Sequence, residues 1–242
     1  MNNSLFLFSR FCQILRSDQP NIGILMSGGG SNADVLLQKR HLYPNLNICS
    51  LITDQASSNA LALAKKHGIN CIVHEGLVNS QENRKNYFTS LTTILQRANI
   101  SALLYAGFMK IATDEFVHTF PGINSHPADL RVLTISGTRK YVGMNAVQLA
   151  IDDDCPEFRC SCCLVEKTVD EGLLIACSNP ILRSELPQSS LSSVLLHEEM
   201  KRSAEWLYYP AVIQKITAGN ISENSTKPYI FTQKELAHAE NN

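Results

Sequence analysis

Short apolar runs alternate with helical patterns along the first half of the chain, and this alternation restricts the fold more than any other feature. Expected strands lie at residues 22–26, 48–52, 71–73 and 102–105, and another begins at Ile123. A helical pattern runs through residues 35–37, and further expected helices lie at residues 57–67, 86–98 and 114–118, the last with Thr113 as a good N-cap. Strict alternation of this kind predicts an α/β fold with a mostly parallel, twisted sheet and helices on both faces.

The second half is less regular. We expect a helix at residues 145–151, strands at 160–165 and 173–176, and a long helical region at 190–216 broken by Pro210. No repeat or linker divides the chain, so residues 21–221 are predicted to form one domain, followed by a polar tail at 222–242. Residues 1–20 form an N-terminal extension. Its basic, acid-free first part is similar to an amphipathic transit peptide, but a frayed or docked extension is the preferred interpretation.

Composition excludes several partners. The 242 residues are 44% hydrophobic and 18% charged, with a net charge of −1 and no basic stripe, which argues against nucleic acid. No apolar run approaches the roughly 20 residues that span a bilayer, so no membrane partner is expected. The cysteine cluster at residues 160–163 lacks the paired spacing of a zinc site and is interpreted as part of a strand, with no metal. Reduced thiols indicate a cytoplasmic protein.

A glycine-rich turn follows the first strand and precedes a helix. Backbone N–H groups at such a turn, together with the helix dipole, can bind an anion. No Lys-Ser or Lys-Thr follows, and the dinucleotide spacing is unmet, so a phosphate monoester is the preferred ligand. A flexible turn without a ligand is the alternative. The candidate phosphate-binding residues are Gly28, Gly29, Gly30, Ser31 and Asn32.

An amide, an imidazole and a carboxylate come from two separated segments. Asn124 and His126 are two residues apart, so at the end of an extended strand both project to the same side. Asp170 follows about forty residues later. A carboxamide and an imidazole can polarise a carbonyl and move a proton, while a carboxylate fixes the imidazole tautomer. The set suits acyl transfer to an amine, and ligands in parallel sheets bind at the strand ends where these residues lie.

These segments together resemble the glycinamide ribonucleotide formyltransferase family and, more broadly, the formyltransferase catalytic-domain superfamily. The resemblance runs from about residue 22 to residue 221 and rests on several motifs in the family's order. They are residues 24–32 (ILMSGGGSN), 52–54 (ITD), 104–111 (LYAGFMKI), 120–127 (FPGINSHP), 169–172 (VDEG), and Glu205 with Tyr209-Pro210.

The resemblance implies a Rossmann-like formyltransferase fold and transfer of a formyl group from the co-substrate 10-formyltetrahydrofolate to the amine of a phosphorylated acceptor. Glycinamide ribonucleotide, in purine biosynthesis, is the first candidate. It implies Asn124, His126 and Asp170 as catalytic residues, and Glu205 at the amine substrate. Small molecules are the expected partners of a monomer or homodimer. The implied folate-binding residues are Met109, Lys110, Ile111 and Ala112.

The sequence departs from the family pattern at two places. Residues 128–131 (ADLR) stand where the family has Ser-Leu-Leu-Pro, and residues 170–173 (DEGL) where it has Asp-Gly-Gly-Pro. Three alternatives therefore stay open. They are a formyltetrahydrofolate hydrolase, a formyltransferase with another amine acceptor, and a catalytically silent folate-binding relative.

Overall fold

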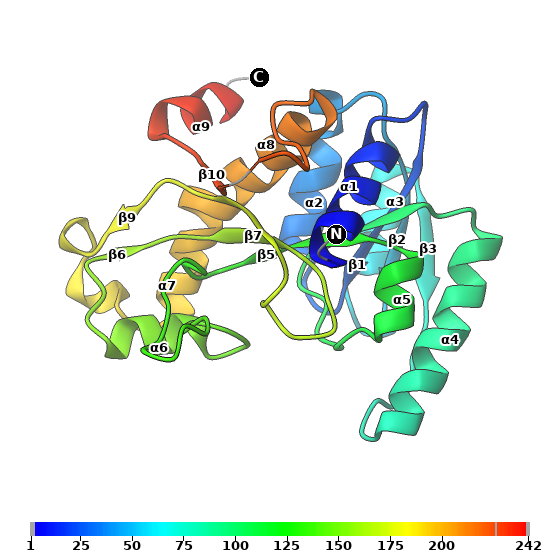
Figure 1. Ribbon diagram of the computed structural model, residues 1–242, viewed down its shortest axis with the longest axis horizontal. Helices are drawn as coiled ribbons and strands as arrows, with labels where there is room; N and C mark the ends of the chain where they lie inside the picture. Colours follow the sequence, from blue (N-terminus) through cyan, green and yellow to red (C-terminus); the bar gives the residue numbers. More distant parts are fainter. Residues whose placement is uncertain (1–2, 226, 241–242) are drawn as a thin grey trace.

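A computed structural model describes residues 3–225 and 227–240, and within them eight strands form one mixed sheet. Their order is β10-β8-β7-β5-β4-β1-β2-β3 (Figure 1). The strands are β1 (Asn21–Met26), β2 (Asn47–Thr53), β3 (Asn70–Val73), β4 (Ala102–Tyr105), β5 (Gly122–His126), β7 (Ser161–Leu164), β8 (Leu174–Cys177) and β10 (Tyr229–Ile230). A separate antiparallel pair consists of β6 (Glu157–Phe158) and β9 (Ile181–Leu182).

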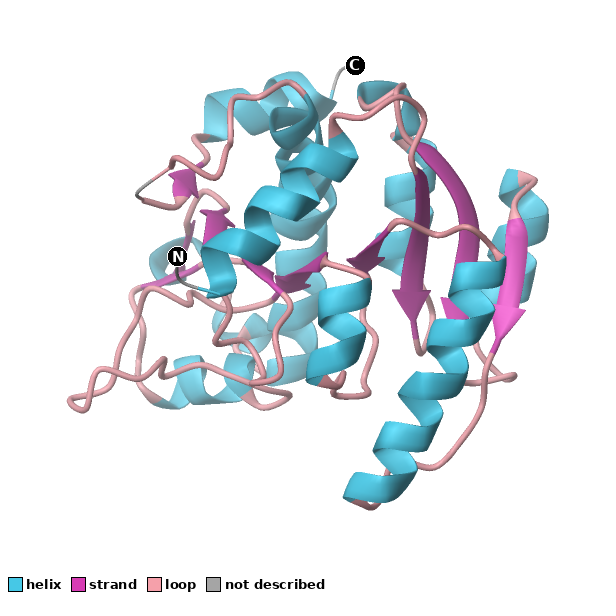
Figure 2. Cartoon of the chain, turned by 45° about the vertical axis from the view of Figure 1, so that its right-hand side comes forward, coloured by secondary structure: helices cyan, strands magenta, loops and turns pink. Residues whose placement is uncertain are grey.

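Helices cover both faces of the sheet (Figure 2). They are α1 (Asn3–Leu15), α2 (Ser31–Gln38), α3 (Ala60–His67), α4 (Gln81–Arg97), α5 (Asp114–Thr119), α6 (Ala146–Asp152), α7 (Ser193–Met200), α8 (Trp206–Thr217) and α9 (Gln233–Glu240). Successive side chains of a strand face opposite sides, which divides the core in two. Ile24 of β1 belongs to the cluster packed by α1, α2, α3 and α8, whereas its neighbour Leu25 belongs to the cluster packed by α4 and α5.

The predicted α/β fold with a mostly parallel sheet is confirmed. Strands β3, β2, β1, β4 and β5 pair in parallel, as the alternation requires. The less regular second half adds β7 antiparallel to β5, and β8 antiparallel to β7. The Thr113 hydroxyl accepts from the Phe116 N–H, which confirms the cap of α5, and Ser80 caps α4 in the same way.

The expected break at Pro210 was wrong. Helix α8 continues through this residue, and the irregularity lies just before it, in a π-helical turn over Lys201–Glu205. A proline lacks the N–H that would bond to the carbonyl four residues earlier. The π-helical turn also leaves intrahelical hydrogen bonds unmade. It directly precedes α8, so the missing bonds of the turn and of Pro210 fall in the same part of the helix.

The N-terminal extension is docked as a helix. One face of α1 is buried through residues that include Phe8 and Phe11, and α1 packs on α8 and β4. Arg16 fastens its end, because its guanidinium donates to the carbonyls of Ile216 and Ile221, at 3.0 and 2.8 Å. Most of the large apolar residues in the stretch that is similar to a transit peptide are part of the main core, whereas Leu5 and Phe6 are exposed.

The segment after residue 221 was expected to be a polar tail, but part of it packs on the domain. Residues Tyr229 and Ile230 pair in parallel with Ala176 and Cys177 and so extend the sheet by one strand. Phe231 is buried against the core beside Tyr208, with the ring centroids 6.3 Å apart. A few apolar side chains in an otherwise polar segment are enough to dock it. Across residues 3–225 and 227–240, no helix has the length and apolar character needed to cross a membrane.

Candidate active site

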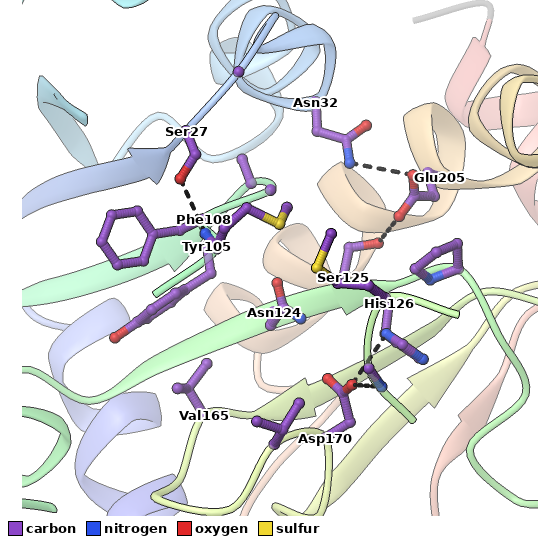
Figure 3. A pocket seen from close by; sticks show the side chains of 18 of the residues that line it. Ser27, Asn32, Tyr105, Phe108, Asn124, Ser125, His126, Val165, Asp170 and Glu205 are labelled. Atoms are coloured by element: carbon purple, nitrogen blue, oxygen red, sulfur yellow. Dashed lines mark hydrogen bonds and ion pairs between the residues drawn. The ribbon is translucent and has the colours of Figure 1, made fainter. Parts of the chain in front are cut away.

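The carboxyl ends of β1, β4 and β5 border one cavity of about 690 Å³. Its walls are the glycine-rich turn after β1, residues 105–112 after β4, the end of β5, the connection between β7 and β8, and helix α7. This volume falls in the range of sites for small organic ligands. The three segments that the sequence places at one edge of the sheet therefore meet around a single space (Figure 3).

Asn124 and His126 both line this cavity, as their spacing on a strand predicts. The carboxamide of Asn124 makes no side-chain hydrogen bond within residues 3–225 and 227–240, so both of its polar atoms can serve a bound molecule. Its position on β5 is fixed by pairing with Tyr105 on one side and Cys163 on the other. Asn124 thus presents an amide donor from a rigid strand.

His126 is held at both ring nitrogens. Nδ1 lies 3.3 Å from Oδ2 of Asp170, and both side chains are less than a tenth exposed. Nε2 lies 2.8 Å from the Tyr141 carbonyl. A carbonyl oxygen can only accept, so Nε2 carries a proton in this contact. An imidazolium ring would donate to both partners, and the carboxylate would stabilise its charge.

Asp170 sits in the connection between β7 and β8, with its backbone in the left-handed region at φ 55°. Aspartate tolerates this conformation better than most residues. The Gly143 N–H donates to Oδ2, the carboxylate oxygen that faces His126, at 2.8 Å. Its neighbour Glu171 is exposed and does not line the cavity, so the charge that replaces the family's glycine points away from the site.

Gly172, two residues beyond Asp170, has no room for a side chain. A Cβ there would lie 1.9 Å from the carbonyl oxygen of Leu164 in the neighbouring strand. We expect Gly172→Ala to lower the free energy of unfolding by about 1–3 kcal/mol, because backbone must move to relieve the overlap. Chemical denaturation measures this, with Gly29→Ala as the comparison, since a Cβ at Gly29 meets nothing within 4 Å. Equal stability of the two variants would contradict the close approach.

The glycine-rich turn is built as expected for an anion site. Gly30 caps α2 in the left-handed conformation, at φ 73°, and no side chain bonds to the first N–H groups of the helix. A Cβ on Gly30 would lie 2.5 Å from the Met26 side chain, so glycine is required. Gly28 and Gly29 are exposed, with open space beside them. The Ser27 hydroxyl accepts from the Met109 N–H at 3.0 Å and ties the turn to the segment after β4.

Glu205, which was expected to contact the amine substrate, is almost fully buried. It lines the cavity but is only 2% exposed. Asn32 donates to Oε2 at 3.2 Å, and the Ser125 hydroxyl donates to Oε1 at 2.6 Å. The carboxylate therefore bridges the glycine-rich turn and the strand of Asn124 and His126. Asn32 points its amide at Glu205 rather than at the open side of the turn.

The four residues expected to bind folate all line the cavity, in two different ways. Met109 and Ile111 are 57% and 43% exposed and present apolar surface at its mouth, whereas Ala112 is buried. The ammonium of Lys110 lies 3.0 Å from Oδ2 of Asp54 and over the ring of Tyr87. The ammonium of Lys110 is thus paired within the protein. The side chains of Met109 and Ile111 and the backbone of this segment can contact a flat ring.

Several residues at the site had no signal in the sequence. The Tyr141 and Gly143 contacts use backbone atoms, so no side-chain pattern indicates them, although Gly143 has the left-handed φ of 73° that favours glycine. His197 and Lys201 also line the cavity, and their spacing of four residues on a helix could have indicated a shared face. Burial, with the nearby positive charge of Lys201, lowers the pKa of His197, so this ring is neutral in the physiological range.

The cysteines are buried thiols. Cys160, Cys162 and Cys163 lie on or beside β7, as the strand interpretation expects, and burial raises the pKa of Cys163 to about 12. Among the described residues, no group of three or more metal-ligating side chains could hold a metal ion.

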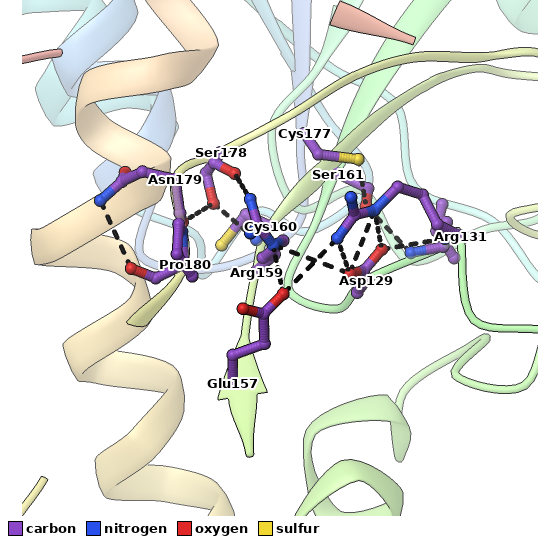
Figure 4. A network of polar contacts seen from close by, with 11 residues as sticks. Asp129, Arg131, Glu157, Arg159, Cys160, Ser161, Cys177, Ser178, Asn179 and Pro180 are labelled. Carbon is purple, nitrogen blue, oxygen red and sulfur yellow. Dashed lines mark hydrogen bonds and ion pairs between the residues drawn. The ribbon is translucent and has the colours of Figure 1, made fainter. Parts of the chain in front are cut away.

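The residues that depart from the family after Pro127 form a charged network outside the cavity (Figure 4). Asp129 accepts from Arg131 at 2.5 Å and lies 3.9 Å from Arg159, which donates to Glu157 at 2.8 Å. Arg159 also donates to the Ser178 carbonyl and so ties this network to the end of β8. None of residues 128–131 lines the cavity.

A mostly parallel α/β sheet carries an amide and a paired imidazole and carboxylate at the carboxyl ends of its strands, a set of groups that can serve acyl-group chemistry. A profile of the formyl transferase family matches residues 20–205, and the chain belongs to this family. The phosphoribosylglycinamide formyltransferase of Haemophilus influenzae is 27% identical over 86% of this chain and 92% of its own length.

Longer relatives also match. The trifunctional purine biosynthetic protein adenosine-3 of Chironomus tentans is 24% identical over 90% of this chain, which spans 15% of that protein. Among solved structures, glycinamide ribonucleotide transformylase 1 from Symbiobacterium toebii superposes with a TM-score of 0.69 at 22% identity. That superposition covers 83% of this chain and 89% of the other. At this identity, the likeness supports the fold.

Proposed function

We propose that this protein transfers the formyl group of 10-formyltetrahydrofolate to the amine of a phosphorylated acceptor, with glycinamide ribonucleotide as the first candidate. The observation that carries the proposal is one cavity that holds Asn124, the His126–Asp170 pair and an open glycine-rich turn. Family membership supports formyl transfer, and the names of the relatives above support this acceptor.

The proposed reaction needs little beyond these residues. The amine nitrogen attacks the formyl carbon, a C–N bond forms, and negative charge develops on the formyl oxygen. The Asn124 amide donates a hydrogen bond to that oxygen, and an imidazolium at His126, whose nitrogens face Asp170 and Tyr141, stabilises it through its positive charge. The bond from the formyl carbon to the folate nitrogen then breaks. The leaving nitrogen gains a proton and the attacking nitrogen loses one, through His126 or through water.

The substrates are assigned to opposite sides of the cavity. The free N–H groups at the start of α2 and the open backbone of Gly28 and Gly29 suit the acceptor's phosphate. The apolar side chains of Met109, Ile111 and Val165 suit the flat face of a pterin, whose polar edge would meet backbone groups. The formyl group then lies between them, beside Asn124.

A formyl-transfer assay tests the proposal. We expect release of tetrahydrofolate from 10-formyltetrahydrofolate to require glycinamide ribonucleotide. We also expect the same acceptor without its phosphate to react with a kcat/KM lower by about 10²-fold, since charge-assisted contacts are lost. Gly29→Asp should raise KM for the phosphorylated acceptor about 10-fold by repulsion and leave the dephosphorylated one unaffected.

The alternatives give distinct outcomes. Release at the same rate without any amine would identify a hydrolase. Turnover only with another amine from a panel of phosphorylated acceptors would correct the acceptor. Tight folate binding with no release in any mixture would refute transfer and identify a silent binding protein.

A further inference from the structure

Arg139 forms hydrogen bonds to the β7–β8 connection that contains Asp170. Its guanidinium donates from Nη1 to the Asp170 carbonyl and from Nη2 to the Gly172 carbonyl, the second at 2.7 Å. These two carbonyls flank Glu171, so the planar fork spans the turn. No carboxylate forms an ion pair with Arg139 among the described residues, so its hydrogen bonds to this turn are its polar contacts.

The same short stretch of chain reaches His126. Two residues after Arg139, the Tyr141 carbonyl accepts from Nε2 of His126. Two residues further on, the Gly143 N–H donates to the Asp170 carboxylate. Residues 139–143, which we call the clamp segment, therefore contact both members of the pair. Only Arg139 does so through a side chain; the Gly143 contact comes from the backbone, at a φ of 73° that favours glycine.

The Asp170 connection needs such a support. Its backbone is in the left-handed region at Asp170, and the side chains of residues 167–169 and 171 are exposed. The only hydrogen bond within the turn that involves Glu171 is long, from its N–H to the Thr168 carbonyl at 3.4 Å. A guanidinium supplies two parallel donors at fixed spacing, which a lysine ammonium cannot reproduce.

We propose that Arg139 is a positioning residue. It holds the Asp170 turn so that the carboxylate stays against Nδ1 of His126. Its effect on turnover rests on the proposed function, whereas its effect on the His126–Asp170 contact does not.

Kinetics give the first test. We expect Arg139→Met to lower kcat about 100-fold, since displacement of a catalytic group by about 1 Å has this effect, with KM for both substrates changed less than about 3-fold. Arg139→Lys should fall between this variant and the wild type. Arg183→Met is the matched control. Its guanidinium lies 2.9 Å from Asp154, outside the cavity and the clamp segment, and this variant should keep kcat within about 2-fold.

Nuclear magnetic resonance of ¹⁵N-histidine-labelled protein gives the second test and needs no substrate. The ring signals of His126 are assigned by their loss in His126→Gln. In Arg139→Met, the Nδ1–H signal that faces Asp170 should broaden or vanish, while the Nε2–H signal that faces Tyr141 persists. A merely destabilised protein would lose both.

Two unchanged ring signals in Arg139→Met would overturn the proposal whatever the kcat, as would loss of both signals in a folded variant. Wild-type kcat with a lost Nδ1–H signal would overturn the effect on turnover and leave Arg139 as a structural support of the contact. If the methionine variant does not fold, Arg139→Lys is judged by the same two readouts. If the wild-type protein transfers no formyl group, the proposed function fails, and the ring signals alone decide the role of Arg139.

Discussion

Replacement of His126 by glutamine is expected to lower kcat for formyl transfer by about 10²–10⁴-fold, the usual contribution of a positioned proton-transfer group. The glutamine fills the buried space and can still donate to the Tyr141 carbonyl. It cannot carry a positive charge or exchange a proton at neutral pH. Single-turnover measurements with both substrates saturating would show that the chemical step is the one affected.

His118→Gln is the control for this variant, because His118 lies on α5, outside the cavity, where its Nδ1 contacts the Asp114 carbonyl. Its kcat should match the wild type. Turnover of His126→Gln within a few-fold of the wild type would remove His126 from the mechanism.

Asp170→Asn is expected to lower kcat by about 10²–10³-fold and to leave the melting temperature within a few degrees of the wild type. The amide oxygen can keep the hydrogen bond from Gly143, so the turn should survive. The side chain, however, no longer has the charge that stabilises an imidazolium at His126. The amide can instead turn its nitrogen toward His126. Its N–H group then faces the Nδ1–H of an imidazolium ring, and two donors cannot form a hydrogen bond with each other.

Asp152→Asn is the matched control, since this carboxylate on α6 is exposed and, among the residues that the structure describes, accepts a side-chain hydrogen bond only from Gln148, at 2.7 Å. If Asp170→Asn turned over as fast as this control, the 3.3 Å contact with His126 would have no part in the reaction.

Much of the site could be predicted because its residues stand at the ends of strands. Apolar runs locate β1, β4 and β5, and parallel pairing then brings their carboxyl ends to one edge. The positions of Asn124 and His126 follow from the two-residue period of a strand. Asp170 lies between two predicted strands, so its approach to His126 follows once β7 pairs with β5.

The support of the site could not be predicted in the same way. Residues 128–145 contain little regular structure before α6, and neither hydrophobic period places Arg139 or the backbone groups of Tyr141 and Gly143. Their contacts depend on how a long loop folds back on a turn. The burial of Glu205 depends likewise on partners from two other elements, Asn32 on α2 and Ser125 on β5.

The helix break expected at Pro210 was wrong for a physical reason. A proline inside a helical pattern normally ends the helix, and the sequence does not show that a wide turn precedes it. The two-residue strand β10 was missed because it is too short and too polar to show a period.

The wide turn over Lys201–Glu205 also sets the orientation of the helix before it. In an α-helix each residue turns the chain by about 100°, so one additional residue in the turn rotates α7 by that angle relative to α8. His197 and Glu205, on opposite sides of this insertion, face the same space. In a regular helix two residues eight apart lie about 80° apart around the axis, and one inserted residue reduces this to about 20°. The irregular turn therefore acts as a fixed angular correction that brings His197 and Glu205 onto nearly one line along the binding chamber.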